Sequence, residues 1–189
     1  MITKKVTGII LNNQPYLELD RRLVVFSYEY GIIHIIAKGV RKITSRRACH
    51  LDLFNLVKME LEESGNGANR IGYLREITIT KPYREMKTDP YNFSAACLIS
   101  LFLRKILPEG ASQTNVFDLT ESTFEALTAG KDSKKILFAY FLKVMRTLGL
   151  LPDILPQKNA RQMLFKALLN IDPQFTLNAR RTLEIFSRL

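Results

Sequence analysis

The chain has 189 residues, of which 47% are hydrophobic and 24% charged, a composition that favours one or two compact domains and excludes a wholly disordered chain. Its formal net charge of +10 favours an anionic partner, either a nucleic acid or a negatively charged membrane surface, although a merely soluble surface is the alternative. Because the sequence contains no run of 18 apolar residues and no apolar N-terminal stretch of signal-peptide length, we expect a cytoplasmic protein without a membrane span.

The first part of the chain is patterned for β-strands. The Tyr28–Gly31 segment favours a tight hairpin, because Gly31 can adopt a positive φ angle, and residues 64–69 carry the strongest turn signal. Five short strands in about eighty residues, without intervening helices, predict a small sandwich or barrel. We expect the strands at residues 4–12, 22–27, 32–38, 53–62 and 70–80.

The pattern changes to amphipathic helices at Asp89-Pro90, where Asp89 suits an N-cap and Pro90 a first helical position. We therefore predict an α+β protein with an OB-like β-barrel domain at residues 1–80 and an α-helical domain at residues 81–189. The expected helices cover residues 90–106, 115–129, 132–148, 157–169 and 177–187.

A dense cationic stretch, residues 38–47, separates the third and fourth expected strands. No acidic residue lies between Glu29 and Asp52. Such a loop can neutralise backbone phosphates, although a solvated surface loop is the alternative interpretation. The cations that we expect to bind DNA are Lys38, Arg41, Lys42, Arg46 and Arg47, with Arg70 added from the loop between the fourth and fifth strands.

Aromatic residues are the second expected element of a DNA site, since OB folds stack bases on exposed rings beside a cationic groove. Phe26 and Phe54 lie among aliphatic residues in expected strands, so we expect both in the core. Tyr28 and Tyr30 flank a turn and are base-stacking candidates, for which a core position is equally compatible. Tyr73 is a further candidate.

Catalytic and metal-binding patterns are weak. His34 and His50 have no cysteine or acid at metal-ligand spacing, and Cys49 and Cys97 form no CxxC pair. A two-metal nuclease would need converging carboxylates. The densest acidic group consists of Glu60, Glu62 and Glu63. We expect a protein that is not an enzyme and that has no metal, no cofactor and no small-molecule substrate.

The helical region carries scattered cations on helices with apolar faces. These cations fit solvated helix faces, and they also fit a groove for an acidic peptide. The second hypothesis for function is therefore an adaptor whose basic surface binds acidic peptide segments of protein partners.

Residues 20–42, DRRLVVFSYEYGIIHIIAKGVRK, resemble the N-terminal signature of the RecO family of bacterial DNA repair proteins. In that signature an Asp-Arg pair opens a strand, a glycine turns the hairpin, and the next strand ends in Ala-Lys-Gly, a small residue and two cations. The matching positions are Asp20, Arg21, Gly31, Ala37, Lys38, Gly39, Val40, Arg41 and Lys42. LPEG (107–110) and LGLLPD (148–153) look like landmarks of the family's helical region, so the resemblance covers about residues 1–153.

The resemblance implies an OB-fold domain followed by a helical domain. It implies single-stranded DNA binding and strand annealing by a recombination mediator in the bacterial cytoplasm, at the nucleoid. It also implies partnership with RecR, with the single-strand binding protein SSB and indirectly with RecA. Many members carry a four-cysteine zinc element after the LGLLPD position, but residues 154–161 contain no cysteine. We therefore expect a short member without that element.

Overall fold

The computed structural model describes residues 2–64 and 71–152, and the chain divides into two compact units. The first contains Met1–Tyr83 and Leu107–Phe117, and the second contains Arg84–Ile106 and Asp118–Leu189. Arg70 and the two helices expected at 157–169 and 177–187 lie outside the described residues.

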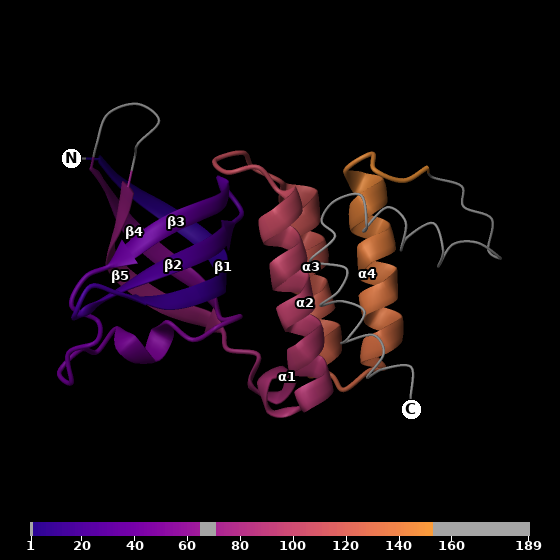
Figure 1. Cartoon of the computed structure of the whole chain (residues 1–189), viewed down its shortest axis with the longest axis horizontal. Coiled ribbons are helices and arrows are strands. Elements are labelled where there is room, and N and C mark those ends of the chain that lie inside the picture. The colour runs from indigo at the N-terminus through magenta and orange to yellow at the C-terminus, as the bar shows by residue number, and fades with distance from the viewer. Residues whose placement is uncertain (1, 65–70, 153–189) are drawn as a thin grey trace. The chain divides into compact units, whose positions relative to one another are not determined.

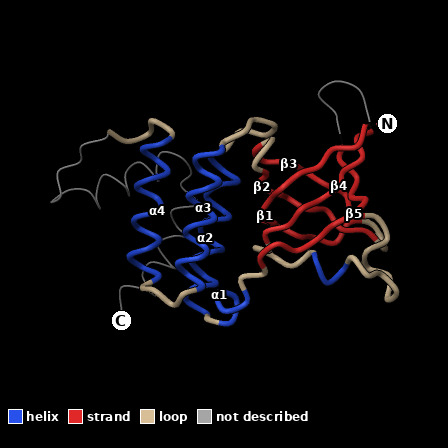
Figure 2. Tube along the Cα trace, turned by 180° about the vertical axis from the view of Figure 1, so that it is seen from behind, coloured by secondary structure: helices blue, strands red, loops and turns tan. Residues whose placement is uncertain are grey.

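The described part of the first unit is a five-stranded β-barrel (Figures 1 and 2). Neighbouring strands pair in the order β1-β2-β3-β5-β4, and β4 closes the barrel against β1. All pairs are antiparallel except β3 with β5, whose Cα partners are Ile35↔Gly72 and Ile36↔Tyr73. The predicted OB-type barrel is confirmed. Its strands are β1 (Ile2–Tyr16), β2 (Asp20–Ser27), β3 (Gly31–Ala37), β4 (Leu56–Ser64) and β5 (Ile71–Lys81).

Alternate residues of the strands fill the barrel. On β3, Ile35 and Ala37 lie in the core, and on β4, Val57, Met59 and Leu61 do the same. These are the faces that the alternating sequence pattern predicts. The intervening residues of each strand point away from the barrel axis.

Two predicted strand limits differ from the structure by three residues or more. β1 continues through Pro15 as far as Tyr16, because β2 remains paired with it down to the Tyr16↔Asp20 pair. The fourth strand begins at Leu56 and not at residue 53, because Phe54 has a φ angle of 67°, which interrupts an extended chain. Phe54 is nevertheless only 1% exposed, so its predicted place in the core is confirmed.

The segment Leu107–Phe117 packs on the barrel although it follows the first long helix in the chain. Glu109 forms a parallel bridge with Ile32 on β3. The Gly110 N–H donates to the Ile32 carbonyl oxygen at 3.1 Å. The outward-facing side chain of Ile32 is consequently only 3% exposed.

The end of the same segment covers β2. The ring of Phe117 lies 5.3 Å from that of Phe26, centroid to centroid, and Phe26 is 0% exposed. The Ser112 hydroxyl donates to the Tyr28 carbonyl oxygen at 2.8 Å. Phe26 therefore lies in the core as predicted, although it is buried on the outer surface of the barrel and not inside it.

The described helices are one short 3-10 helix and four α-helices: η1 (Ala48–His50), α1 (Arg84–Thr88), α2 (Pro90–Ile106), α3 (Thr114–Thr128) and α4 (Ser133–Thr147). Asp89 accepts the Asn92 N–H at 2.8 Å, which confirms the predicted cap. Asp132 accepts the N–H groups of Lys135 and Lys134 at 3.2 and 3.0 Å. These bonds, led by the one from Lys135, hold the pKa of the Asp132 carboxyl below its usual value.

Aromatic side chains join the helices of the second unit. The rings of Phe102 on α2 and Phe141 on α4 meet at 4.8 Å. The hydroxyls of Thr120 on α3 and Tyr140 on α4 share a hydrogen bond of 2.8 Å, and burial raises the pKa of Tyr140. Within residues 2–64 and 71–152, each helix is too short or too polar to cross a membrane.

Candidate nucleic-acid interface

Residues 38–47, the cationic loop, leave the end of β3 and dock against the β1–β2 hairpin. The Gly39 N–H donates to Asp20 Oδ1 at 2.8 Å, and the Arg41 N–H donates to the Leu19 carbonyl oxygen at 2.9 Å. Val40, between them, is 1% exposed and belongs to the barrel core. The loop is therefore fixed at its base by the signature residues Asp20 and Gly39.

The outer half of the cationic loop is closed by its own backbone. The Lys42 N–H donates to the Gly39 carbonyl oxygen at 3.3 Å, and the Ser45 N–H donates to the Lys42 carbonyl oxygen at 2.9 Å. These turns hold three cations in an exposed position: Arg41, Lys42 and Arg46. Across the described residues, no carboxylate forms an ion pair with any of the five predicted DNA-binding cations of the loop. The loop is thus a source of uncompensated positive charge.

Arg47 differs from the other four cations because its guanidinium is engaged with the barrel. It donates to the carbonyl oxygens of Lys38 at 2.9 Å, Leu74 at 2.9 Å and Arg75 at 3.2 Å. These bonds join the end of β3 to β5, beyond the two residue pairs through which the strands meet directly. Arg47 therefore supports barrel closure, a role that the charge pattern did not predict.

Lys38 lies on the outer surface of the same seam between β3 and β5. Its side chain is exposed, and Nζ lies 4.1 Å from the centroid of the Tyr73 ring on β5. This cation–π contact steers the ammonium group across the seam. The predicted base-stacking candidate Tyr73 is thus partly covered by a neighbouring cation.

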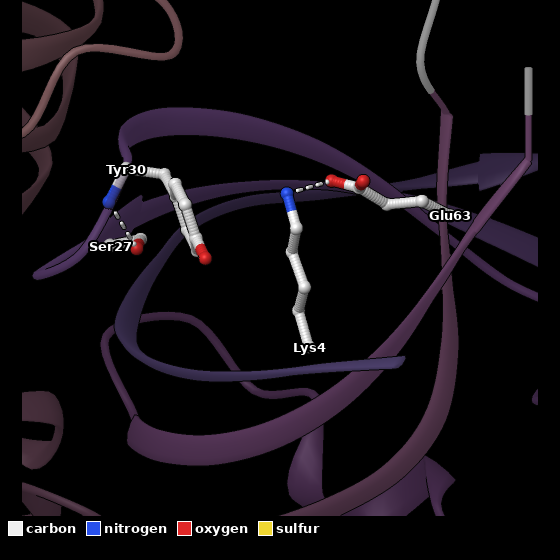
Figure 3. A network of polar contacts seen from close by, with 4 residues as sticks. All are labelled: Lys4, Ser27, Tyr30 and Glu63. Atoms are coloured by element: carbon white, nitrogen blue, oxygen red, sulfur yellow. Dashed lines mark hydrogen bonds and ion pairs between the residues drawn. The ribbon is translucent and has the colours of Figure 1, made fainter. Parts of the chain in front are cut away.

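Tyr30 lies at the mouth of the barrel (Figure 3). Lys4 Nζ is 4.7 Å from the centroid of the Tyr30 ring and 2.7 Å from Glu63 Oε1. The Tyr30 N–H donates to the Ser27 hydroxyl oxygen at 3.0 Å. The ring also packs against the barrel core, so one part of Tyr30 is buried and another is not.

The two predicted tyrosines are separated from the cationic loop. The β2–β3 ladder runs from the Arg21↔Ala37 pair, beside the loop, to the Ser27↔Gly31 pair, beside the tyrosines. At about 3.3 Å per residue, this ladder is roughly 20 Å long. Tyr28 is 41% exposed at the far end. The structure therefore brings the cations of the loop together and leaves Tyr28 and Tyr30 at the opposite end of the ladder.

Sequence reasoning missed two neighbours of the cationic loop. Arg22 is exposed on β2 and pairs with Ile36 on β3. Ile36 and Lys38 alternate on the outward face of that strand, so Arg22 lies on the same outer surface as Lys38. Strand alternation could have identified it. The hairpin tip, residues 17–19, carries the exposed side chains of Leu17 and Leu19, and no sequence pattern indicates that it adjoins the loop.

The acidic group on β4 does not converge. Glu60, Glu62 and Glu63 each pair with a different cation: Lys5 at 3.7 Å, Arg75 at 3.1 Å and Lys4 at 2.7 Å, respectively. Within the part of the chain that the structure describes, no three His, Cys, Asp or Glu side chains are grouped closely enough to hold a metal ion. This arrangement gives the nuclease hypothesis no support.

Comparisons with known proteins agree with the two-part fold. Residues 1–83 match the family described as "Recombination protein O N terminal", and residues 87–154 match "Recombination protein O C terminal". The DNA repair protein RecO of Syntrophobacter fumaroxidans is 28% identical over 154 residues, which cover 82% of this chain and 60% of the relative.

Proteins of the same name show similar coverage. The one from Anaeromyxobacter sp. strain K is 26% identical over 150 residues, covering 79% of this chain and 58% of the relative. One from Listeria monocytogenes is 24% identical over 151 residues, covering 80% and 58%. The chain spans about three fifths of the length of these curated relatives. Because the N-terminal match lies on the barrel and the C-terminal match on the helices, the chain belongs to the RecO family.

Proposed function

We propose that this protein binds single-stranded DNA and anneals complementary strands as a recombination mediator in DNA repair, without catalysing a covalent reaction. One observation carries the proposal: the cationic loop presents Arg41, Lys42 and Arg46 to solvent with no carboxylate paired to them among the described residues. Family membership supports the same conclusion, since the relatives are named DNA repair protein RecO.

Annealing requires two physical effects. Repulsion between two phosphate backbones must be reduced, and the base edges must remain available for pairing. Cations on a loop anchored by backbone hydrogen bonds supply the first effect by binding phosphates. Because such binding involves no base edges, it is compatible with the second effect and gives affinity without base specificity.

The proposal is tested by charge reversal on the exposed part of the loop. The variant is Arg41→Glu, Lys42→Glu and Arg46→Glu, with Arg47 retained because its guanidinium supports barrel closure. The measurements are the affinity for a fluorescent single strand over a range of salt concentrations and the rate of annealing. We expect weaker binding and slower annealing. The magnitude of the salt slope, d log K/d log[salt], should fall by about 2, which is about 0.7 for each phosphate that the loop no longer neutralises.

A matched control reverses three exposed cations of the second unit: Arg104, Lys105 and Lys131, each to Glu. Both sets change the net charge equally, so the control should retain most of the wild-type affinity and annealing. Equal losses in both variants would contradict a role for this loop. Binding to an acidic peptide that survives the loop reversal and is abolished in the control would favour the adaptor hypothesis.

The partners and location follow from the family and belong to the proposal. We propose RecR, the single-strand binding protein SSB and, indirectly, RecA as partners, in the bacterial cytoplasm at the nucleoid. Pull-down of purified RecR and SSB by this chain tests the direct contacts. A negative result would restrict the proposal to DNA binding and annealing, since the relatives extend beyond the matched region.

A further inference from the structure

Two large aliphatic side chains are exposed beside the cations of the loop. Leu17 is 72% exposed at the hairpin tip, and Ile43 is 106% exposed in the cationic loop. Each forgoes the stabilisation that burial of an aliphatic side chain provides. A single exposed apolar residue is ordinary in a folded protein, so exposure alone carries no conclusion.

The backbone of Leu17 supplies an independent observation. Its φ angle is 51°, in the left-handed region, where a branched, bulky residue is a genuine outlier. Glycine or asparagine would form the same turn with less strain. The turn geometry therefore does not explain a leucine here, and its side chain is the feature left to explain.

Hydrogen bonds place the backbones of both residues close to Arg41. Arg41 Nη1 donates to the Leu17 carbonyl oxygen at 3.3 Å, and the Arg41 N–H donates to the Leu19 carbonyl oxygen. Ile43 lies two residues after Arg41, inside the turn that the Ser45 N–H closes on Lys42. Leu17 thus adjoins Arg41 through its carbonyl oxygen, and Ile43 directly follows the exposed Lys42 in the chain.

We propose that Leu17 and Ile43 contact the faces of unstacked bases in a strand whose phosphates lie on Arg41, Lys42 and Arg46. This inference rests on the proposed function and adds the groups that distinguish single strands from duplexes. Base faces are accessible in a single strand and covered by stacking in a duplex, and aliphatic side chains are known to insert at unstacked steps. A strand is favoured over an anionic membrane because it offers phosphates and apolar faces at alternating, closely spaced positions.

The test separates bases from phosphates. The probes are an oligothymidylate and an oligomer of equal length whose sugars carry no base. Wild type should bind the oligothymidylate about tenfold more tightly than the abasic strand. The Leu17→Ser/Ile43→Ser variant should bind both probes with the abasic affinity and an unchanged salt slope, because every phosphate-binding cation is retained.

Two further variants protect the test from folding artefacts. Leu17→Gly relieves the backbone strain, so it should be as stable as wild type or more stable, and yet it should lose part of the preference for bases. Leu101→Ser/Leu150→Ser removes exposed leucines of the second unit, where Leu101 is 39% and Leu150 49% exposed. This pair should leave both affinities unchanged.

Each outcome is decisive. Equal affinity of wild type for the two probes would overturn the assignment of Leu17 and Ile43 while leaving phosphate binding, and thus the proposed function, intact. If wild type binds neither of the two probes, the proposed function is overturned as well. If the double serine variant loses binding to phosphatidylglycerol vesicles but keeps the wild-type preference for oligothymidylate, the two residues belong to a membrane contact and the inference is wrong.

Discussion

Arg47 illustrates how a cation inside a basic stretch can serve the fold. Its guanidinium donates three hydrogen bonds to backbone carbonyl oxygens on both sides of the β3–β5 seam. Arg46, the preceding residue, is exposed, and its side chain has no ion-pair partner among the described residues. The two adjacent arginines therefore carry the same charge, but only Arg47 bonds to the barrel backbone, so their variants can be compared directly.

We predict that Arg47→Ala lowers the free energy of unfolding by about 2 kcal/mol, because hydrogen bonds from a charged donor contribute roughly 1.5–3 kcal/mol. Arg46→Ala should change that free energy by less than about 0.5 kcal/mol, as is usual for a surface position. Urea denaturation followed by circular dichroism measures both. Similar values for the two variants would show that Arg47 does not hold the seam.

The same residue marks a limit of sequence reasoning at this scale. Charge and spacing place Arg41, Lys42, Arg46 and Arg47 in one class, and only the course of β5, about thirty residues later in the chain, separates Arg47 from the rest. The positive φ angle of Leu17 is equally invisible in the sequence, since leucine is not a residue that signals a left-handed turn.

Among the elements, the β2–β3 hairpin and the segment Leu107–Phe117 are packed closely together at Gly31. Gly31 has a φ angle of 65°, and a Cβ atom added there would lie 2.0 Å from the Ala111 carbonyl oxygen. Gly39 has a similar φ angle of 67°, but a Cβ atom there would first meet the Lys42 side chain at 3.8 Å. At Gly31 a side chain would be disfavoured both by the positive φ angle and by the contact with Ala111. At Gly39 only the positive φ angle disfavours a side chain.

We predict that Gly39→Ala lowers the free energy of unfolding by about 1 kcal/mol, the cost of a left-handed alanine. Gly31→Ala should cost roughly 3 kcal/mol or more, because the segment must also move away from the hairpin. Thermal and urea denaturation provide the comparison. If the two alanine variants were equally stable, close packing of this segment against the hairpin would be refuted.

Elements that depend on local signals were predictable. The caps at Asp89 and Asp132, the alternation along β3 and β4 and the glycine in the hairpin each act within a few residues of the structure that they specify. The limits of β1 and β4 were not, because pairing with β2 extends the first and the left-handed Phe54 delays the second. Both depend on contacts formed across the barrel.

For the molecule as a whole, the barrel unit is discontinuous in the chain. Its outer surface on β2 and β3 includes Phe26 and Ile32, which are buried under residues that follow α2. The periodicity of the sequence could not reveal this return, since residues 107–117 carry turn signals that fit an ordinary loop between helices. The order of strands and helices along the chain was therefore predictable from the sequence. The assignment of residues 107–117 to the barrel unit was not.

We predict that a fragment of residues 1–83 exposes Phe26 and Ile32 and binds the dye ANS, which reports accessible apolar surface. The complete chain under the same conditions should bind little dye and melt at a higher temperature. Introducing Phe26→Ser into the fragment should reduce dye binding, which assigns the signal to that surface. A fragment that excludes the dye and melts as the complete chain does would show that the barrel needs no cover.

The return of residues 107–117 to the barrel also constrains how the protein is made. A ribosome releases all five strands before it releases α2, and it releases α2 before the segment that covers β2 and β3. The residues that cover Phe26 and Ile32 are therefore synthesised only after all five strands and α2 are complete. For the same reason, an exchange of gene segments that ends after Tyr83 would not transfer the whole barrel unit. The transferred strands would lack residues 107–117 of their own sequence.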